Sequence, residues 1–317
     1  MEMILRTCPM CGSSDSSEVF AEANYELERL DGYAFASRKI PEYMHYRLID
    51  CPTCDLLYAN PMPCEDDLAA GYFAASYDSS VEAHYAAATY AKTLSTFLDL
   101  LPDRHGALDI GTGDGAFLEY LLEKGFDRLC GVEPSRAPIA AARKDVRPLI
   151  REGIFRGDDF VPESLSLVTC FQTLEHLGDP LVMAKTAWKL LKPGGAAFFI
   201  CHNRRALSAR LLGKKSPIFD IEHLQLFSPK SAVYLLEHAN FIDVRVMDIV
   251  NRYPMSYWIK LLPLHQKIKR LLIATLDLIG VGSWSMSLPA GNIAVVGFKQ
   301  LHHNVSPDTG PTSETPA

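Results

Sequence analysis

A glycine-rich turn that follows a short apolar segment carries the first residues whose types and spacing could do chemistry. It reads Asp109-Ile110-Gly111-Thr112-Gly113-Asp114-Gly115. Glycines allow a sharp turn and a close approach of the backbone to a ligand. Glu133 follows Gly111 by 22 residues, at the end of the next predicted strand, where a carboxylate can accept both hydroxyl protons of a ribose. The pattern predicts a nucleoside site, although the spacing Gly111-x-Gly113-x-x-Ala116 also fits a loose dinucleotide fingerprint.

The charges of this turn distinguish the two ligands. A dinucleotide would place a pyrophosphate beside Asp109 and Asp114, and at about 4 Å with an effective dielectric near 20 each such pair costs about 4 kcal/mol. S-adenosylmethionine has no phosphate, and it carries an ammonium and a sulfonium cation. The acidic turn therefore favours S-adenosylmethionine.

Four successive motifs resemble those of class I S-adenosylmethionine-dependent methyltransferases. They are Asp109-Ile-Gly-Thr-Gly-Asp-Gly115, Gly131-Val-Glu-Pro-Ser135, Leu174-Glu-His-Leu-Gly-Asp-Pro180 and Leu191-Lys-Pro-Gly-Gly195. The resemblance covers roughly residues 101 to 300. With the N-terminal cysteine pairs and the segment 222–228, the chain is similar to a bacterial group often linked to cell-surface glycan and secondary-metabolite pathways.

The resemblance implies the positions of a cofactor site. Its residues would be Asp109, Gly111, Thr112, Gly113, Glu133, Pro134, Phe155 and Gln172, with Asp109 and the glycines at the methionyl part and Glu133 at the ribose. Ile154 and Phe155 fall where the family contacts adenine, and Gln172 falls near the methionyl side. One position departs from the family, because Ser166 stands where an Asp is usual; we expect the change to affect local hydrogen bonding more than chemistry.

Methyl transfer to a hydroxyl or amine requires removal of a proton, so a base that titrates near neutrality is expected. His176 follows Glu175 just past a predicted strand, beside the cofactor site, and His223 follows Glu222 in a loop where an acceptor could sit. Both are candidate catalytic bases, with His202 as a third. The competing interpretation is that each histidine packs against a backbone carbonyl.

Two pairs of cysteines near the N-terminus have the spacing of a metal site. Cys8 and Cys11 form one Cys-x-x-Cys pair, and Cys51 and Cys54 form the other. Four thiolates suit a tetrahedral, structural Zn²⁺ with no open coordination position. Redox-active pairs and unligated cysteines are the alternatives.

Strand and helix signals alternate from residue 105 to residue 200. Predicted strands are Ala107–Gly111, Leu129–Val132, Leu165–Phe171 and Ala196–Cys201, with helices at Ala116–Lys124 and Leu181–Leu191. A helix from Ser228 to about Ala239 and strands at Phe241–Val250 and Asn292–Phe298 follow. This order predicts an α/β fold: a Rossmann-like, seven-stranded, mostly parallel sheet with helices on both faces, plus a small N-terminal zinc ribbon.

The predicted organisation has four parts. They are a zinc-ribbon-like domain at 1–64, a helical bridge at 65–100, a methyltransferase domain at 101–301 with a basic amphipathic insertion at about 251–288, and a disordered tail at 302–317. The start of the chain lacks the features of a signal peptide, and no apolar run reaches the ~20 residues that span a bilayer, so we expect a cytoplasmic setting.

The net charge and the distribution of basic residues indicate which kinds of molecule the chain could bind. The net charge of −7 argues against a nucleic-acid partner. Residues 202–219 and 255–275 are nevertheless basic and contain no acid, and the second stretch would be amphipathic as a helix. It could contact a membrane surface peripherally or hold a phosphate-bearing acceptor; a lid helix with a solvated basic face is the alternative.

The leading expectation is methylation of a sugar, nucleotide sugar or glycan, including a lipid-linked one. An alternative is methylation of a quinone or small aromatic metabolite, which a pocket lined by Phe219, Tyr257 and Trp258 would favour. A second alternative is a non-catalytic module that binds a partner. The intact glycine turn and Glu133 argue against that module.

Overall fold

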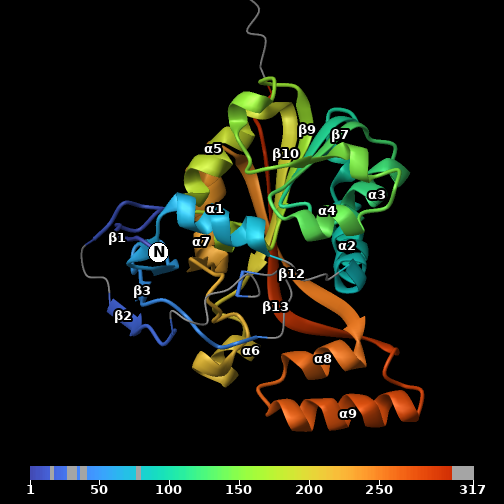
Figure 1. Ribbon diagram of the computed structural model, residues 1–317. Helices are drawn as coiled ribbons and strands as arrows, with labels where there is room; N and C mark the ends of the chain where they lie inside the picture. The colour runs from blue at the N-terminus through green and yellow to red at the C-terminus, as the bar shows by residue number, and fades with distance from the viewer. Residues whose placement is uncertain (15–17, 27–33, 36–40, 76–79, 302–317) are drawn as a thin grey trace, which may run out of the picture.

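The computed structural model describes residues 1–14, 18–26, 34–35, 41–75 and 80–301. The predicted tail at 302–317 lies outside these residues. The chain folds around a seven-stranded sheet in the order β12-β13-β10-β9-β6-β7-β8 (Figure 1). Five strands are parallel, namely β6 (His105–Ile110), β7 (Asp127–Glu133), β8 (Ile150–Glu152), β9 (Leu165–Phe171) and β10 (Leu191–His202). β13 (Ser285–Phe298) runs antiparallel to both of its neighbours, β10 and β12 (Ile242–Pro254), so the predicted fold class is confirmed.

Helices cover both faces of the sheet, as the nearly continuous burial of its central strands β6 and β9 requires. α2 (Ser80–Leu94) and α3 (Ala116–Glu123) pack on one face, against Ala107, Leu167 and Phe198. α5 (Pro180–Leu190) and α7 (Pro229–Glu237) pack on the other face, against Leu108 and Phe199. Figure 1 shows the two pairs of helices on opposite sides of the strands.

The helices begin where local capping chemistry allows it. Asp179 caps α5 by accepting a hydrogen bond from the Val182 amide, and proline occupies the first helical turn. Ser228 and Ser231 form a reciprocal capping box at the start of α7. These caps account for the good agreement between the predicted and observed helix starts.

The sheet has a switch point between β6 and β9. From β6 the chain passes through α3 to β7 on one side, and from β9 it passes through α5 to β10 on the other side. Two adjacent strands whose connections diverge leave a crevice at their carboxyl ends, and α/β sheets bind ligands there.

The N-terminal segment forms a second sheet, in the order β11-β4-β3-β2. Its own strands are β2 (Glu18–Ala21), β3 (Leu48–Asp50) and β4 (Leu57–Ala59), while β11 (Gln225–Leu226) comes from the far end of the chain. β1 (Met3–Ile4) pairs with β5 (Met62–Pro63) beside it. The cysteines and Tyr58 share one apolar core with α5 and α7, so this segment is packed into the methyltransferase-like sheet domain.

Two side chains join the N-terminal segment to the rest of the fold. The Arg6 guanidinium donates hydrogen bonds to the carbonyls of Ala59, Gly178 and Leu224, and its burial lowers the pKa of Arg6 to about 10. The Gln225 amide donates to the carbonyls of Leu174 and Leu177 at 2.6 and 2.7 Å.

The structure differs from the expected single helix over residues 255–275. It has α8 (Met255–Leu261) and α9 (Gln266–Leu278) instead, and the two form a hairpin at the end of the β12–β13 ribbon. The break lies at Pro263, because a proline disfavours helical geometry at the residue before it, and Leu262 is extended. α1 (Glu65–Ala74) and α2 fill the predicted helical bridge.

Replacing Gln225 with alanine tests the junction between the N-terminal sheet and the main domain. Gln225 is fully buried, so Gln225→Ala leaves two carbonyls without their donors and should lower the free energy of unfolding by about 3 kcal/mol. Urea denaturation followed by circular dichroism measures this. The exposed Gln300→Ala is the control and should change stability by less than about 0.5 kcal/mol; equal effects of the two variants would contradict the junction.

Candidate active site

A cavity of about 470 Å³ opens at the carboxyl ends of β6, β7 and β9. Its walls come from the glycine turn, from the loop at 153–157, from α5 and from the helices α1 and α2 of the N-terminal third of the chain. The volume falls within the usual range for small-molecule sites. The predicted cofactor residues Asp109, Gly111, Thr112, Gly113, Glu133, Pro134, Phe155 and Gln172 all line this one cavity.

The backbone of the turn requires glycine. Gly111 and Gly113 have φ values of 73° and 61°, in the left-handed region. A Cβ atom at Gly111 would lie 2.2 Å from the Thr173 hydroxyl, whereas the position at Gly113 has nothing within 4 Å. Gly111 thus permits close packing within the protein, and Gly113 leaves open space beside the cavity.

Asp109 is buried at the end of the central strand β6, with 2% of its surface exposed. Its two carboxylate oxygens accept hydrogen bonds from the hydroxyls of Thr169 and Thr112, at 2.6 and 2.7 Å. Burial raises the pKa of Asp109 to about 6, with a smaller contribution from the charge of Glu133. The side chain therefore holds the turn in place and also contributes negative charge that a cationic ligand would stabilise.

Glu133 ends β7 and fastens the other side of the turn. Its Oε2 accepts from the Gly113 amide at 2.9 Å, and its Oε1 accepts from the Ser135 amide at 2.8 Å. A carboxylate has about four lone-pair positions, so Glu133 keeps acceptor capacity for ribose hydroxyls. Two backbone amides fix its orientation toward the cavity wall.

Gln172 and Phe155 line the same cavity. Gln172 has a φ of 52°, which is uncommon for a residue with a side chain. Its buried side-chain amide nitrogen has no hydrogen-bond partner within the part of the chain that the structure describes. A buried donor at a cavity wall without a protein acceptor fits a ligand that supplies the acceptor.

The charge of the cavity wall is one-sided. Among the described residues that line it, none is Lys or Arg and six are acidic, namely Glu65, Asp109, Asp114, Glu133, Asp179 and Glu222. Carboxylates repel phosphate at this range and attract an ammonium or a sulfonium. The expectation of a phosphate-bearing acceptor held by the basic segments is not supported, because no basic residue of 202–219 or 255–275 belongs to this wall.

Of the candidate bases, His176 lines the cavity. Its Nδ1 lies 3.0 Å from the hydroxyl of Tyr72 on α1, and that hydroxyl donates to the Glu222 carbonyl at 3.3 Å. Burial, with the charges of Glu222 and Glu175, raises the pKa of Tyr72 well above its usual value, so the phenol keeps its proton. The Tyr72 hydroxyl therefore lies between Nδ1 of His176 and the Glu222 carbonyl and fixes the orientation of the imidazole ring.

His223 lies one layer behind His176. It is 7% exposed, and it is not among the described residues of the cavity wall. Its Nδ1 lies 2.8 Å from the Ile218 carbonyl, and its ring lies between those of His176 and His202, with centroid distances of 5.1 and 5.0 Å. The structure thus brings the three predicted histidines together but sets only His176 at the cavity.

Ser166 lies at the start of β9, at the edge of the sheet away from the cavity. Its hydroxyl donates to the Asp103 carboxylate and to the His105 carbonyl, and Lys192 donates to the same carboxylate at 2.9 Å. Asp103 thus supplies a carboxylate beside the position where the family usually has Asp. The departure affects local hydrogen bonding, as the sequence suggested.

Sequence patterns identify the family to which this fold and cavity belong. The family described as "Methyltransferase domain" matches residues 83–246, slightly more than half of the chain. The chain belongs to this family. Together with the four motifs and the sheet topology, the match makes it a class I, S-adenosylmethionine-dependent methyltransferase.

Curated relatives match the same region. A ubiquinone biosynthesis O-methyltransferase of Aliivibrio fischeri (strain MJ11) is 28% identical over 143 residues, which cover 41% of this chain and 61% of that protein. The enzyme of the same name from Idiomarina loihiensis is 34% identical over 141 residues, covering 43% of this chain and 54% of that protein. The chain thus spans little more than half the length of these relatives.

Solved structures with a similar fold include other methyltransferases. A SAM-dependent methyltransferase from Archaeoglobus fulgidus has 16% identity and a TM-score of 0.46, and the match covers 67% of this chain and 94% of that one. The phosphoethanolamine N-methyltransferase 2 of Haemonchus contortus, in complex with S-adenosyl-L-methionine, has 16% identity and a TM-score of 0.42, covering 67% and 53%.

Tyr72, Phe35 and Tyr90 line the cavity of this methyltransferase and were not found by motif reasoning. They lie in the N-terminal half, before the family motifs begin. The Ala- and Tyr-rich composition of 61–101 was the available signal for Tyr72 and Tyr90, and Phe35 lies outside that segment. By contrast, Phe219, Tyr257 and Trp258, whose presence in an acceptor pocket would have favoured an aromatic acceptor, are not among the described residues that line this cavity.

The raised pKa of Asp109 predicts that donor affinity depends on pH. Above pH 6 the carboxylate is mostly ionised and stabilises the bound cation; below pH 6 it is mostly protonated, so the affinity for S-adenosylmethionine should fall about threefold between pH 8 and pH 5.5. Calorimetric titration at several pH values measures this. Asp109→Asn should bind about tenfold more weakly at pH 8 and lose the pH dependence near 6; an unchanged slope in that variant would contradict the assignment.

Proposed function

We propose that the chain transfers the methyl group of S-adenosylmethionine to a hydroxyl of a small aromatic acceptor of the quinone or quinol type. The observation that carries the proposal is the cavity wall, which holds six carboxylates and, among the described residues, no Lys or Arg. Such a wall favours a cationic donor and an acceptor without phosphate. It therefore favours the aromatic alternative over the glycan expected from the sequence.

The donor would occupy the part of the cavity at the strand ends. Asp109 and the amide of Gln172 lie where the methionyl part is expected, and Glu133 lies where the ribose is expected. Bound there, S-adenosylmethionine would supply an electrophilic methyl group on a positively charged sulfur. The chain's part is to hold the donor and to keep the charge of Asp109 beside it.

The acceptor would occupy the part of the cavity formed by α1 and the segment before it. Phe35 packs edge-on against Tyr72 at a centroid distance of 5.7 Å, and Tyr72 packs edge-on against His176, also at 5.7 Å. This row of rings, with Leu68, offers an apolar surface to a planar ring. The relatives named for ubiquinone biosynthesis also support an aromatic acceptor.

His176 is proposed as the general base. Its ring lines the cavity and is oriented by Tyr72, and the imidazole would take the proton of the acceptor hydroxyl as the oxygen gains its methyl group. His223 packs behind this ring, with Nδ1 fixed by the Ile218 carbonyl. We therefore assign His223 a positioning role, in place of the direct role that the sequence suggested.

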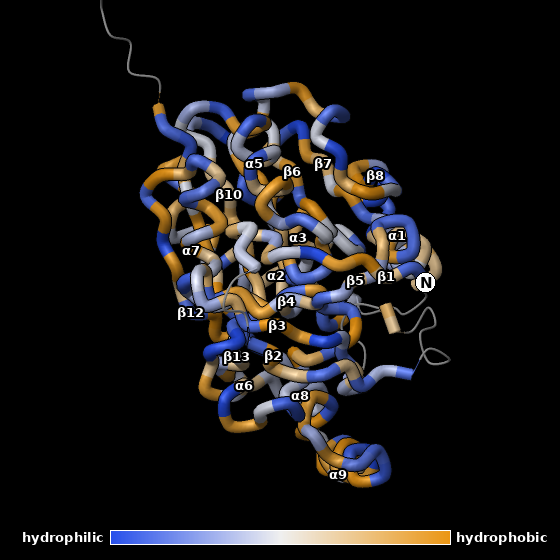
Figure 2. Tube along the Cα trace, turned by 90° about the vertical axis from the view of Figure 1, so that its left-hand side faces the viewer, coloured by the Kyte–Doolittle hydropathy of each residue, from blue (hydrophilic) through white to orange (hydrophobic). Residues whose placement is uncertain are grey.

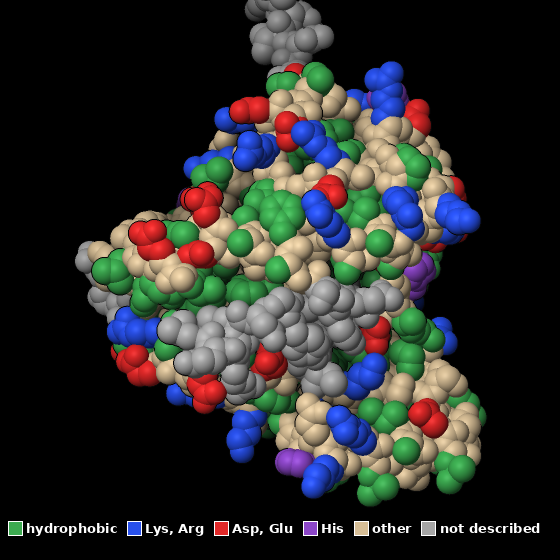
Figure 3. Space-filling view, in the orientation of Figure 1, with side chains coloured by type: hydrophobic (Ala, Val, Ile, Leu, Met, Phe, Trp, Pro, Cys, Tyr) green, Lys and Arg blue, Asp and Glu red, His purple; other side chains and the backbone are tan. Residues whose placement is uncertain are grey.

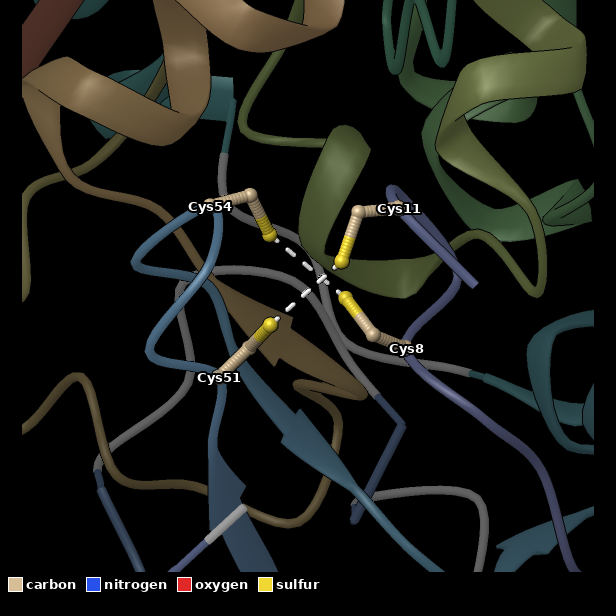
Figure 4. Close-up of side chains that lie close together, drawn as sticks. All are labelled: Cys8, Cys11, Cys51 and Cys54. Atoms are coloured by element: carbon tan, nitrogen blue, oxygen red, sulfur yellow. Dashed lines mark hydrogen bonds between the residues drawn. The ribbon is translucent and has the colours of Figure 1, made fainter. Parts of the chain in front are cut away.

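Zn²⁺ is proposed to hold the four N-terminal cysteines. The sulfur atoms of Cys8, Cys11, Cys51 and Cys54 all lie within 4.8 Å of one another, and the pairs Cys8–Cys54 and Cys11–Cys51 are 3.5 Å apart (Figure 4). A tetrahedron with Zn–S bonds of about 2.3 Å has sulfur atoms about 3.8 Å apart, so the donor set fits. A hydrogen bond with Cys54 lowers the pKa of Cys8 to about 5, which favours a thiolate.

Such a metal would be structural. Three of the four cysteines are buried, and four thiolates complete the tetrahedron, so water and substrate would have no open position. Its place beneath α5 and α7 would brace the junction with the N-terminal sheet.

The proposed reaction predicts the effect of replacing His176. With catechol as the probe acceptor, His176→Ala should lower kcat by about 10²-fold or more and leave the affinity for S-adenosylmethionine unchanged, because only proton removal is lost. His223→Ala should lower kcat less. His238→Ala, which replaces a histidine at the exposed end of α7, is the control. A larger loss with His223→Ala than with His176→Ala would reverse the two assignments.

A comparison of acceptors tests the substrate class. Radiolabelled methyl transfer should be found with catechols and hydroquinones and not with nucleotide sugars. Transfer to nucleotide sugars alone would restore the glycan hypothesis. In calorimetry, binding of S-adenosylmethionine that Glu133→Ala weakens would support an enzyme, whereas no binding by the unaltered protein would favour the non-catalytic module.

Metal content tests the zinc site. The purified protein should contain one equivalent of zinc per chain, and Cys51→Ser should lose most of it and unfold at a lower temperature, because three thiolates hold the ion more weakly. Cys64→Ser is the matched control, since Cys64 is single and lies at the start of α1. One equivalent of zinc retained by Cys51→Ser would contradict the site.

A further inference from the structure

The hairpin of α8 and α9 projects beyond the seven-stranded sheet, at the end where β10 finishes. β12 and β13 continue past the sheet as a two-stranded ribbon, pairing from Asn251↔Leu288 to Pro254↔Ser285, and the helices close its end (Figure 1). Both side views show α9 at the margin of the molecule (Figures 1 and 2). The proposed methyl-transfer site does not use this hairpin, because none of its described residues lines the cavity.

The hairpin is held in a defined position. The Trp258 indole donates to the Met286 carbonyl at 3.0 Å, and Lys269 donates to the Lys260 carbonyl at 2.7 Å, which joins α9 to α8. Lys260 also pairs with Glu82 on α2 at 3.2 Å, so the hairpin is tied to the main domain. The exposed side chains described next therefore sit on an ordered element.

Exposed apolar side chains are concentrated here. Of the 27 large hydrophobic residues that are exposed in the described part of the chain, ten lie between residues 262 and 288. Several are very open, with Leu278 at 87%, Leu271 at 67%, Trp284 at 65% and Ile279 at 62%. The remaining six are Leu262, Leu264, Ile268, Leu272, Met286 and Leu288. A concentration of this kind on a soluble domain marks a contact surface.

Cations are interspersed with these residues. Lys267 and Arg270 are exposed on α9, and Asp277 is the one acidic residue among 255–284. Figure 3 shows Lys and Arg side chains beside hydrophobic ones at this end of the molecule. The positive charge of this hairpin contrasts with the net charge of −7 of the whole chain, so it is a local feature of this end of the molecule.

A second basic element lies at the same end. α6 (Leu207–Leu212) and the turn at Gly213–Lys215 pack on the other side of the β13 base, where the Ser208 hydroxyl donates to the Ala290 carbonyl at 3.1 Å. On α6 the side chains of Leu207 and Leu211 are 70% and 76% exposed, and they lie next to the cations Arg210, Lys214 and Lys215. The fold thus places the two acid-poor segments of the sequence at one end.

We propose that this end of the molecule docks peripherally on an anionic lipid bilayer. The α8–α9 hairpin would insert the apolar side chains near Leu271, Leu278 and Trp284 into the interface, and the cations of α9 and α6 would face lipid phosphates. An amphipathic helix with apolar and Lys/Arg residues is the recognised form of such contacts. No helix of the described residues is long and apolar enough to cross a membrane, so the contact is one of surface binding.

Charge favours a bilayer over a second copy of the chain. A symmetric dimer through this end would bring Lys267, Arg270 and the α6 cations of both copies together with little acid to pair them. An anionic lipid surface supplies opposite charge to all of them at once. Exposed Trp284 is also typical of residues at the lipid–water interface.

Vesicle flotation tests the proposal with the full chain. The protein should float with vesicles of phosphatidylcholine and phosphatidylglycerol at 0.1 M salt, bind at least tenfold less to phosphatidylcholine alone, and dissociate at 1 M salt. Leu271→Ser/Leu278→Ser and Lys267→Glu/Arg270→Glu should each lower binding at least tenfold while circular dichroism and methyl transfer to a soluble acceptor stay unchanged.

Matched variants away from this end control for loss of apolar area or charge. Leu122→Ser/Val161→Ser removes exposed apolar residues, and Lys144→Glu/Lys185→Glu reverses exposed cations; both should bind as the wild type does. Trp284→Phe should still bind and should lose the vesicle-induced blue shift of tryptophan fluorescence. Failure of the wild type to float, equal loss in the control variants, or a dimer in light scattering that Leu271→Ser/Leu278→Ser abolishes would overturn the proposal.

Discussion

Burial of the Asp109 carboxylate at the end of the central strand is the constraint on which the site depends. Two threonine hydroxyls satisfy its oxygens, yet no Lys or Arg lies among the described residues of the cavity beside it. A buried carboxylate with hydrogen bonds but no opposite charge is unstable in its ionised form, and so its pKa is raised. A cationic ligand supplies the missing charge. The same wall makes the site a poor one for phosphate.

The N-terminal third of the chain completes this site from the opposite side. β11 joins the N-terminal sheet to residues 225–226, and Arg6 and Gln225 connect the two parts through buried hydrogen bonds. α1 then brings Tyr72 against His176. The cysteine cluster, the aromatic wall and the candidate base are therefore mechanically linked, although they lie far apart in the sequence.

The positions of the basic segments in the sequence led to a wrong expectation about the acceptor. The segments 202–219 and 255–275 are basic and lie after strands that frame the acceptor side, which suggested a phosphate-bearing acceptor. The fold instead carries the cations of α9 to the far end of a β ribbon and those of α6 to the base of the same ribbon. Tyr257 and Phe219, which were considered for an acceptor pocket, pack into the apolar core and do not line the described cavity. A side chain's sequence position says which element it belongs to, and packing decides which surface it faces.

Local patterns determined a large part of this protein. Hydrophobic periodicity placed most strands of the sheet, Ser228 marked the start of α7, and the spacing of Gly111, Gly113 and Glu133 predicted residues that line one cavity, because each depends on interactions between residues close in sequence. Tertiary structure alone decided that His176 and not His223 reaches the cavity, that Tyr72 orients it, and that the cavity wall lacks cations. These outcomes depend on which distant elements pack together, and the free energy of that packing is spread over the whole core and leaves no signature in any short stretch of chain.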